Sequence, residues 1–592
     1  MKRTKTRALT VALSGVLVAG LAACSGGGTS TGSNTTGGSG NSGSSGSTQA
    51  AGKKGGTLYY YTSRNAEHYD PQRTYIGRDI ANESRMVYRT LTTFPSADGD
   101  ASLKLVPDLA TDTGKASNGN KTWTFTIKKG QKWQDGKDIT CQDFQYGISR
   151  TFATDVITGG PNYAIQFLDI PQNADGSSKY PGPYKAKPAQ QKMFDKAVAC
   201  SGNTITFHLN RPVPDFNQAV YLPAFAPYRK DQDHGDKSNF DVFSDGPYKL
   251  QGKWNEGGTN TFVRNPEWKP DGIRKALPDK IVITEGMEDE VIAQKLIADQ
   301  GNDKFAVTDR SVPAPFIPKV ISNPNAKDRA TNPNSPFNSY LLPNFKSKVM
   351  QNKAVREALL VATDKKAAST ALGTAVSNPN SLSIVNPALK GNWNSNPYNT
   401  TVSGDPAKAK KILQKAGVKM PVPITYIYSR GSNQTDKQAA ALQEGWQKAG
   451  FKVSLDPQTQ NYYTIIQDPS KASQWDVCWG GWGADWPSAS TVIPPLFDSR
   501  VNLNKSSNGQ DYGAYANPQV NKAIDASYNT SSPEEQAKAL EKVDDMLKKD
   551  VAYVPLDITK FFLIRGSGIT GWVDNKAFAD YPDLGAIGVS GS

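Results

Sequence analysis

One short segment, from Trp475 to Trp486, concentrates side chains that suit the binding of a small molecule. It carries four of the chain's 11 tryptophans, spaced by 4, 3 and 4 residues, which matches one face of a helix. A buried helical stripe is therefore one interpretation. However, Gly480, Gly481, Gly483 and Pro487 would each cost a helix about 1 kcal/mol or more, so we favour a strand that ends in a glycine-rich loop.

Such a loop would serve a binding cleft. Glycines let a ligand approach the backbone closely, and indole rings supply apolar walls. The sequence therefore predicts that this segment lines a ligand site.

Groups that would support catalysis or metal binding form no recognisable pattern. The three histidines, His68, His208 and His234, are widely separated and make no H-E-x-x-H motif. The folded part has no phosphate-binding glycine loop and no serine nucleophile elbow. We expect no metal, no cofactor and no enzymatic activity, although an exported hydrolase with an unrecognised site stays an alternative.

The N-terminus predicts export. Lys2, Arg3, Lys5 and Arg7 precede an apolar stretch, Ala8–Ala22, of about 15 residues, which is shorter than the roughly 20 needed to span a bilayer. The stretch ends in Leu21-Ala22-Ala23-Cys24, similar to the lipobox of bacterial lipoproteins, in which the cysteine thiol takes a diacylglycerol. An ordinary signal peptide with an incidental Cys24 is the alternative.

The segment that follows predicts a tether. From Ser25 to Thr48 every residue is Gly, Ser, Thr or Asn, and such a chain is a flexible coil with a reach of roughly 25–30 Å. A lipid on Cys24 would thus place a folded body, starting near Gly55, at the outer face of the cytoplasmic membrane.

Net charge gives little support to nucleic-acid binding. The formal charge of +13 falls to +9 when the four basic residues of the signal are removed. Lysines and arginines alternate with acidic residues through the body, which is typical of a solvated surface.

Three cysteines remain besides Cys24: Cys141, Cys200 and Cys478. Cys141 and Cys200 flank segments that should belong to one sub-domain, so they are the candidate disulfide; two free buried thiols are the alternative.

Hydrophobic periodicity predicts a mixed α/β body. Alternating or apolar runs predict strands, and periodic segments with glycine or proline at their ends predict helices. The expected strands are 57–62, 122–127, 204–209, 422–428 and 451–455. The expected helices are 291–298, 353–363, 406–416, 437–449 and 533–547.

Six motifs, in order along the chain, resemble the family 5 extracellular solute-binding proteins, which serve ABC importers of peptides, nickel and oligosaccharides. The similarity runs from about Gly55 to the C-terminus and is most like the oligopeptide and dipeptide branch. The motifs are GGTL at 55–58 with DPQ at 70–72, VYRTL at 87–91, LVPDLA at 105–110, WQDGKDITCQDF at 133–144, GPYKL at 246–250 with RNPEW at 264–268, and VREAL at 355–359 with Asp364.

The resemblance implies a periplasmic-binding-protein-like fold of class II, or cluster C: two α/β lobes joined by a hinge, plus an inserted third lobe. Strands near 336 and 557 would form the hinge. The implied division is signal peptide 1–23, lipidated cysteine and tether 24–54, lobe I 55–95, lobe II 96–237, lobe I again 238–336, lobe III 337–557 and lobe I again 558–592.

The resemblance also implies a binding site. Trp482 and Asp485 are similar to a W-x-x-D pattern of the peptide-binding branch, whose aspartate pairs with the peptide's α-ammonium. Backbone at Gly481 and Gly483 would bond the peptide main chain, and residues Ile76, Gly77 and Arg78 would pair with it from lobe I. Trp479 and Trp486 would add apolar walls. Trp479 stands where some members have a basic residue, so the resemblance does not imply how a ligand side chain or carboxylate is recognised here.

The sequence thus predicts a monomeric, lipid-anchored binding protein that captures an oligopeptide between two lobes and delivers it to the membrane permease of an ABC importer. The same fold binding an oligosaccharide is the alternative, because sugar rings stack on indoles.

Overall fold

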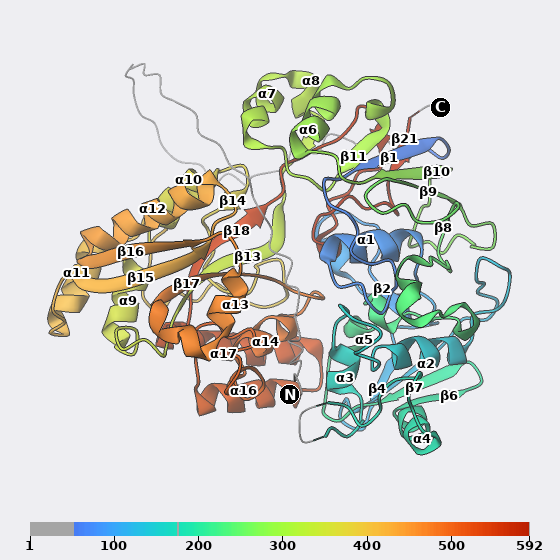
Figure 1. Cartoon of the computed structure of the whole chain (residues 1–592), viewed down its shortest axis with the longest axis horizontal. Helices are drawn as coiled ribbons and strands as arrows, with labels where there is room; N and C mark the ends of the chain where they lie inside the picture. Colours follow the sequence, from blue (N-terminus) through green and yellow to red (C-terminus); the bar gives the residue numbers. More distant parts are fainter. Residues whose placement is uncertain (1–51, 174–176, 591–592) are drawn as a thin grey trace, which may run out of the picture.

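We describe the protein from a computed structural model, which covers residues 52–173 and 177–590. These residues form three bodies, each built on its own β-sheet of five, four or six strands. Figure 1 shows the six-stranded body on the left, and the five-stranded body above the four-stranded body on the right. The predicted signal peptide, the lipidation site at Cys24 and most of the tether lie outside the described residues.

The five-stranded body combines residues from three parts of the chain. Its strand order is β11-β1-β10-β9-β8, in which β1 is parallel to both neighbours and β9 is antiparallel to β10 and β8. Its elements are β1 (Thr57–Tyr61), α1 (Gly77–Met86), β8 (Tyr248–Leu250), β9 (Thr259–Arg264), β10 (Lys280–Thr284), α6 (Asp289–Ala298), β11 (Ala306–Thr308), α7 (Ile317–Ser322) and α8 (Pro324–Lys327). Two short pairs, β12 (Ala330–Thr331) with β19 (Leu563–Ile564) and β20 (Ile569–Thr570) with β21 (Gly588–Val589), bring in the C-terminal segment.

The four-stranded body is an antiparallel sheet of order β4-β5-β7-β6 packed against helices. Its apolar core includes Phe125, Phe144, Phe207 and Phe216, all fully buried. Its elements are β2 (Thr92–Thr93), β3 (Val106–Pro107), β4 (Lys115–Ser117), β5 (Thr122–Thr126), α2 (Cys141–Arg150), α3 (Tyr163–Phe167), α4 (Pro188–Ala197), β6 (Val198–Ser201), β7 (Thr204–His208) and α5 (Phe216–Ala219).

The six-stranded body is a mixed sheet of order β14-β18-β13-β17-β15-β16 with an apolar core on each face. Its strands are β13 (Asn334–Pro343), β14 (Ser377–Asn378), β15 (Val422–Ser429), β16 (Phe451–Gln458), β17 (Val477–Gly483) and β18 (Val554–Lys560). Its helices are α9 (Lys353–Ala362), α10 (Lys365–Leu372), α11 (Pro406–Lys415), α12 (Asn433–Lys448), α13 (Tyr462–Gln467), α14 (Ile493–Phe497), α15 (Ser499–Asn502), α16 (Pro518–Tyr528) and α17 (Pro533–Asp550).

The local signals of the sequence explain these elements. All ten expected helices and strands are confirmed, with ends that differ by a few residues. Helix α11, for example, starts where the Asp405 side chain accepts a hydrogen bond from the backbone N–H of Lys408, and its first residue is Pro406. Gly417, just past its end, adopts a left-handed φ of 67°, which a glycine reaches without strain.

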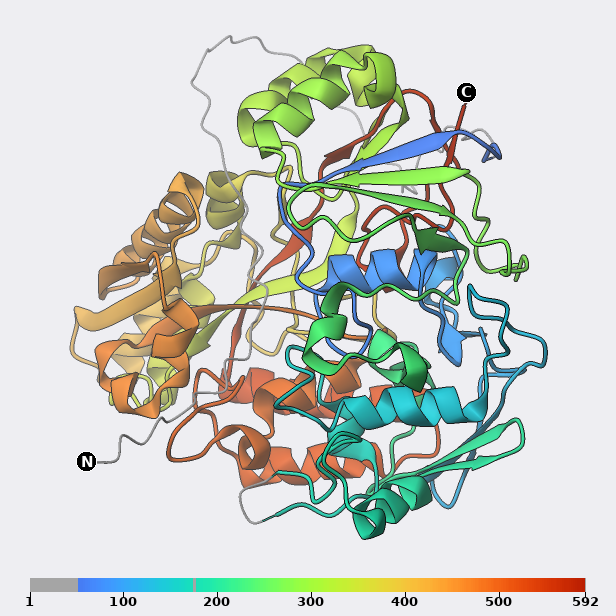
Figure 2. The ribbon, with the colours of Figure 1, turned by 45° about the vertical axis from the view of Figure 1, so that its right-hand side comes forward.

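The chain passes between the five-stranded and six-stranded bodies at two places that lie side by side. β13 leads into the six-stranded sheet and β18 leads out of it, and the two strands pair antiparallel from Asn334 with Lys560 to Leu341 with Val554. Both views show these strands next to each other where the bodies meet (Figures 1 and 2). Because the two crossings are adjacent strands of one sheet, the five-stranded and six-stranded bodies are connected at one place, as a hinge requires.

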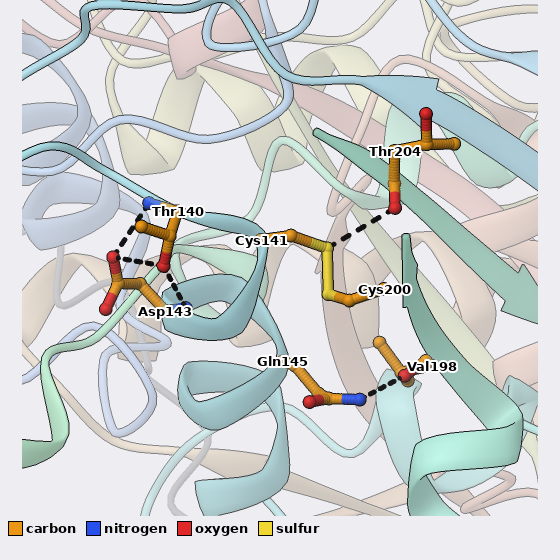
Figure 3. Close-up of a disulfide and its surroundings, with 7 residues drawn as sticks. All are labelled: Thr140, Cys141, Asp143, Gln145, Val198, Cys200 and Thr204. Atoms are coloured by element: carbon orange, nitrogen blue, oxygen red, sulfur yellow. Dashed lines mark hydrogen bonds between the residues drawn. A yellow bond between two sulfur atoms is a disulfide. The ribbon is translucent and has the colours of Figure 1, made fainter. Parts of the chain in front are cut away.

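Cys141 and Cys200 form a disulfide in the structure, with their Cα atoms 5.8 Å apart. The bond joins the start of α2 to β6 within the four-stranded body (Figure 3). Helix α2 is also held by a capping box, in which Thr140 and Asp143 each accept a hydrogen bond from the other's backbone N–H. Cys478 is a free, buried thiol in β17.

Candidate ligand-binding site

A cavity of about 2180 Å³ lies where the three bodies meet. It is larger than the roughly 300–1,000 Å³ of sites for drug-sized ligands. All nine residues that the sequence predicts for the ligand site line this one cavity: Ile76, Gly77, Arg78, Trp479, Gly481, Trp482, Gly483, Asp485 and Trp486. The tertiary structure therefore brings together segments that are 400 residues apart in the chain.

Strand β17 presents its backbone to the cavity. It pairs with β13 along its whole length, from Pro343 opposite Val477 to Phe337 opposite Gly483, but with β15 only at Val477 and Cys478. Among the described residues, no strand pairs with the other edge of β17 beyond Cys478. An extended ligand can add to a sheet at such an edge.

The glycines of β17 also serve its packing. A Cβ atom on Gly483 would lie 2.4 Å from the Phe337 ring, and one on Gly480 would lie 2.5 Å from the Tyr340 ring. On Gly481 it would lie 3.0 Å from the indole of Trp479. The expected strand is confirmed, but the glycines lie within it and not in a loop that follows it, since β17 extends to Gly483. The rings that lie against them leave no room for a side chain at these positions.

The four tryptophans of this segment have different surroundings. Trp475 is buried in the core of the six-stranded body, whereas Trp479 and Trp482 are partly exposed. The Trp482 indole N–H donates to the backbone oxygen of Thr491 at 2.8 Å, which closes the loop on itself.

Trp486 reaches into the neighbouring body. It is 2% exposed and packs in the core of the four-stranded body, where its ring contacts Tyr163 and Phe167. Its indole N–H donates to Asp215 at 2.8 Å. This side chain is therefore occupied mainly by contacts between the two bodies, although the residue also lines the cavity.

Asp485 is held by tyrosines from outside its own body. Its Oδ2 accepts hydrogen bonds from the hydroxyl groups of Tyr75, at 2.9 Å, and Tyr163. Its backbone oxygen accepts one from the hydroxyl of Tyr221 at 2.6 Å. No hydrogen bond within residues 52–173 and 177–590 ends on Oδ1, and Asp485 forms no ion pair there. The carboxylate is thus oriented but has no opposite charge.

The electrostatics of Asp485 follow from this arrangement. Burial raises the pKa of Asp485 to about 6, while the hydrogen bonds from Tyr163 and Tyr75 limit the rise. A nearby cation stabilises a buried carboxylate more strongly than it stabilises a carboxylate in water, because the surroundings screen the attraction less.

Arg78, on the opposite side of the cavity, is fully engaged by the protein. Its guanidinium lies 2.7 Å from Asp79 and 3.9 Å from Asp309. It also donates to the backbone oxygens of Arg64 at 3.2 Å and Asn65 at 3.0 Å. Burial opposes the charged form, but Asp79 and Asp309 outweigh it and raise the pKa of Arg78. Its side chain has little left to offer a ligand.

Sequence reasoning missed the three tyrosines that hold Asp485. Tyr75 precedes α1, Tyr163 begins α3 and Tyr221 follows α5. It also missed Asp557 in β18, a buried carboxylate that lines the cavity. No local pattern marks these residues, because their proximity arises only when the bodies pack together.

The described part of the chain offers neither a metal-binding cluster nor a membrane-spanning helix. No group of three or more His, Cys, Asp or Glu side chains there is arranged to hold a metal ion. No helix among the same residues is both long and apolar enough to cross a bilayer.

Comparisons with known proteins give one consistent result. Residues 104–504 match the model of the bacterial extracellular solute-binding proteins, family 5. The chain is 26% identical over 506 residues to the periplasmic oligopeptide-binding protein OppA of Haemophilus influenzae, covering 83% of this chain and 86% of that one. It is 24% identical over 498 residues to OppA of Bacillus subtilis, covering 81% and 84%. Its fold matches the solved structure of clavulanic acid biosynthesis oligopeptide binding protein 2, with a TM-score of 0.82 and 26% identity over 92% of this chain and 97% of that one.

Proposed function

The chain belongs to the bacterial extracellular solute-binding proteins of family 5, and on this premise we propose that it captures short peptides in the cavity between its bodies. The observation that carries the proposal is Asp485. Its carboxylate is oriented by tyrosines, faces the cavity and lacks an opposite charge, so it suits the α-ammonium group of a peptide. Its relatives named as oligopeptide-binding proteins support this assignment.

The peptide main chain would bind along the free edge of β17. Trp479 to Gly483 lack a strand partner on that edge, and their amide and carbonyl groups could form a ladder with an extended peptide. A ladder of this kind uses backbone groups that every peptide has. Ile76 and Gly77, which line the opposite side of the cavity, would contact the peptide from the five-stranded body.

The protein acts in this proposal without catalysis, as the monomeric capture component of an ABC importer. The lobe boundaries implied by the resemblance are part of the proposal, supported by the two adjacent crossings at β13 and β18. Closure around the ligand would give the permease a shape distinct from the open one. The anchoring of Cys24 to lipid at the outer face of the membrane rests on the motif Leu21-Ala22-Ala23-Cys24.

Calorimetry with a mixed pool of di- to pentapeptides tests the function. We expect saturable binding, and we expect it to weaken at least about tenfold when the same peptides are N-acetylated, since a hydrogen-bonded charge pair contributes about 1.5–3 kcal/mol. An absence of heat with the peptide pool, together with saturable binding of an oligosaccharide, would replace a peptide by a sugar as the ligand.

A further inference from the structure

The cavity carries the opposite charge from the chain as a whole. Ten aspartates and glutamates but only six lysines and arginines line it, although the chain has a net charge of +13. Several of these charges are neutralised in pairs, such as Arg78 with Asp79 and Arg310 with Asp289 at 2.8 Å. The charged side chains without such a pair indicate which charged groups a ligand could supply.

Asp557 is a buried carboxylate of the cavity wall whose neighbours are neutral polar side chains. Residue Asp557 in β18 is 2% exposed, and the described residues offer it no ion pair. Its neighbours are Ser339, Ser377 and Gln438, and the Gln438 amide lies 3.5 Å from Oδ2. Burial raises the pKa of Asp557 to about 7, and these neutral polar side chains limit the rise. A cation beside it would therefore stabilise the ionised carboxylate.

The register of the six-stranded sheet places Asp557 in line with β17, the strand along which the peptide is proposed to bind. Asp557 lies opposite Ser339, and Ser339 lies opposite Gly481, so the three residues form a row across β18, β13 and β17. Directly opposed residues lie on the same face, and two strand spacings amount to about 10 Å. Because serine is small and glycine has no side chain, this row leaves the sheet surface low between Gly481 and Asp557.

The indole of Trp479 completes the surroundings of this row. A Cβ on Gly481 would touch two atoms of the indole, so the ring lies over the start of the row. An indole face attracts a cation and also packs against an aliphatic stem. A flat ring at one end and a carboxylate at the other suit a long side chain with a charged tip.

We propose that Asp557, with the indole of Trp479, forms a subsite for the basic side chain of a lysine or arginine in the bound peptide. The inference rests on the proposed function, since it needs a peptide whose main chain binds along β17. It adds to that function a preference for peptides with a second positive charge, besides the α-ammonium at Asp485. A glutamate in the same position of the peptide would be repelled.

The test uses the full-length protein and tetra-alanine peptides in which one alanine at a time is replaced by lysine, norleucine or glutamate. Norleucine keeps the aliphatic stem and removes the charge. At one peptide position, we expect calorimetry to give a dissociation constant for lysine about ten- to a hundredfold lower than for norleucine. Asp557→Asn should reduce this ratio to about one while the norleucine peptide binds within about twofold of its wild-type affinity.

A matched variant separates the subsite from general effects of removing a buried carboxylate. Asp511 is 1% exposed, belongs to the same body, and does not line the cavity. Asp511→Asn should keep the preference for lysine. Thermal unfolding of Asp557→Asn checks folding, and we expect no loss of stability because the asparagine oxygen can accept the hydrogen bond from Gln438 and the buried charge is removed.

Two outcomes would overturn the subsite alone: tetra-alanine binds but lysine and norleucine are equivalent at every position, or Asp557→Asn keeps the preference. If neither tetra-alanine nor any substituted peptide binds the wild-type protein, the proposed function itself fails, and the subsite fails with it.

Discussion

Arg78 and Asp485 line the same cavity from different bodies, and the protein balances their charges in different ways. Arg78 is surrounded by Asp79, Asp309 and backbone oxygens, which together satisfy its guanidinium. Within the described residues, the Asp485 carboxylate accepts hydrogen bonds from neutral tyrosine hydroxyls alone. A charge with protein partners contributes to the fold, whereas an oriented charge without one is available to a ligand.

This contrast changes how the residues predicted from the sequence should be interpreted. The segments 76–78 and 479–485 line the same cavity. However, Arg78 stabilises the five-stranded body through its ion pairs, whereas the Asp485 carboxylate faces the cavity. Replacing each residue should therefore affect different properties.

The largest expected effect is on stability, at Arg78. Arg78→Ala leaves Asp79 and Asp309 as buried carboxylates without their partner, which should lower the free energy of unfolding by about 3–5 kcal/mol. Urea denaturation measures this loss. Arg78→Lys, which keeps the charge but not the planar fork, should fall between the wild type and the alanine variant. A stable Arg78→Ala protein with impaired peptide binding would contradict the structural role assigned to Arg78 and would make it a ligand-binding residue.

A smaller effect, on binding, is expected at Asp485. Asp485→Asn should weaken binding of a free peptide by about ten- to a hundredfold, since a hydrogen bond to a charged group contributes about 1.5–3 kcal/mol. Stability should be unchanged or slightly higher. Calorimetry with free and N-acetylated peptides completes a double-mutant cycle: acetylation should cost affinity in the wild type and little in the variant. Equal costs of acetylation in both proteins would place the α-ammonium elsewhere.

The smallest expected effect is a pH dependence of the same contact. With the pKa of Asp485 at about 6, roughly one carboxyl in ten is ionised at pH 5, so a lysine-free peptide should bind about tenfold more weakly there than at pH 7. The peptide's α-amino group, with a pKa of about 8, stays charged over this range. Calorimetry at both values, repeated with Asp485→Asn, isolates the contribution of this carboxyl; a pH-independent wild type would contradict it.

The stability of the ligand-free protein should respond to this carboxyl in the opposite direction. The pKa of Asp485 in the folded protein, about 6, lies above the ordinary value of 3.8. The folded state therefore binds the proton more tightly, and this group's contribution to the free energy of unfolding rises as the pH falls from about 6 to about 4. Acid should thus favour the ligand-free fold while it weakens binding, a combination that Arg78 cannot produce.

Part of the site could be predicted because its signal is local. Three glycines and four tryptophans within 12 residues mark Trp475–Trp486 in the sequence alone. Their conflict with a helix follows from the backbone entropy of glycine, so the strand was predictable, whereas its extension through all three glycines was not. The same holds for the helices and strands, whose periodicity and end signals lie within one segment.

Other parts of the site could not be predicted, for a physical reason. Tyr75, Tyr163 and Tyr221 occupy three different segments, and a tyrosine that holds a carboxylate has no sequence signal that separates it from a core tyrosine. The same applies to Trp486, which the sequence assigns to the ligand wall and the structure packs into the neighbouring body. Contacts between bodies depend on how complete surfaces fit, and no single segment contains that information.

The sequence by itself determined many of the helices and strands of this protein, including the glycine-rich strand, and its resemblance to solute-binding proteins, because those depend on neighbouring residues and ordered motifs. Only the tertiary structure decided which charges in the cavity are neutralised and which are not. A carboxylate such as Asp557 is available to a cation because of what surrounds it in space: serine and glutamine side chains from separate segments, with no ion pair to any described residue. Burial and pairing are properties of the assembled bodies, so the charges that remain for a ligand become visible only when the fold is complete.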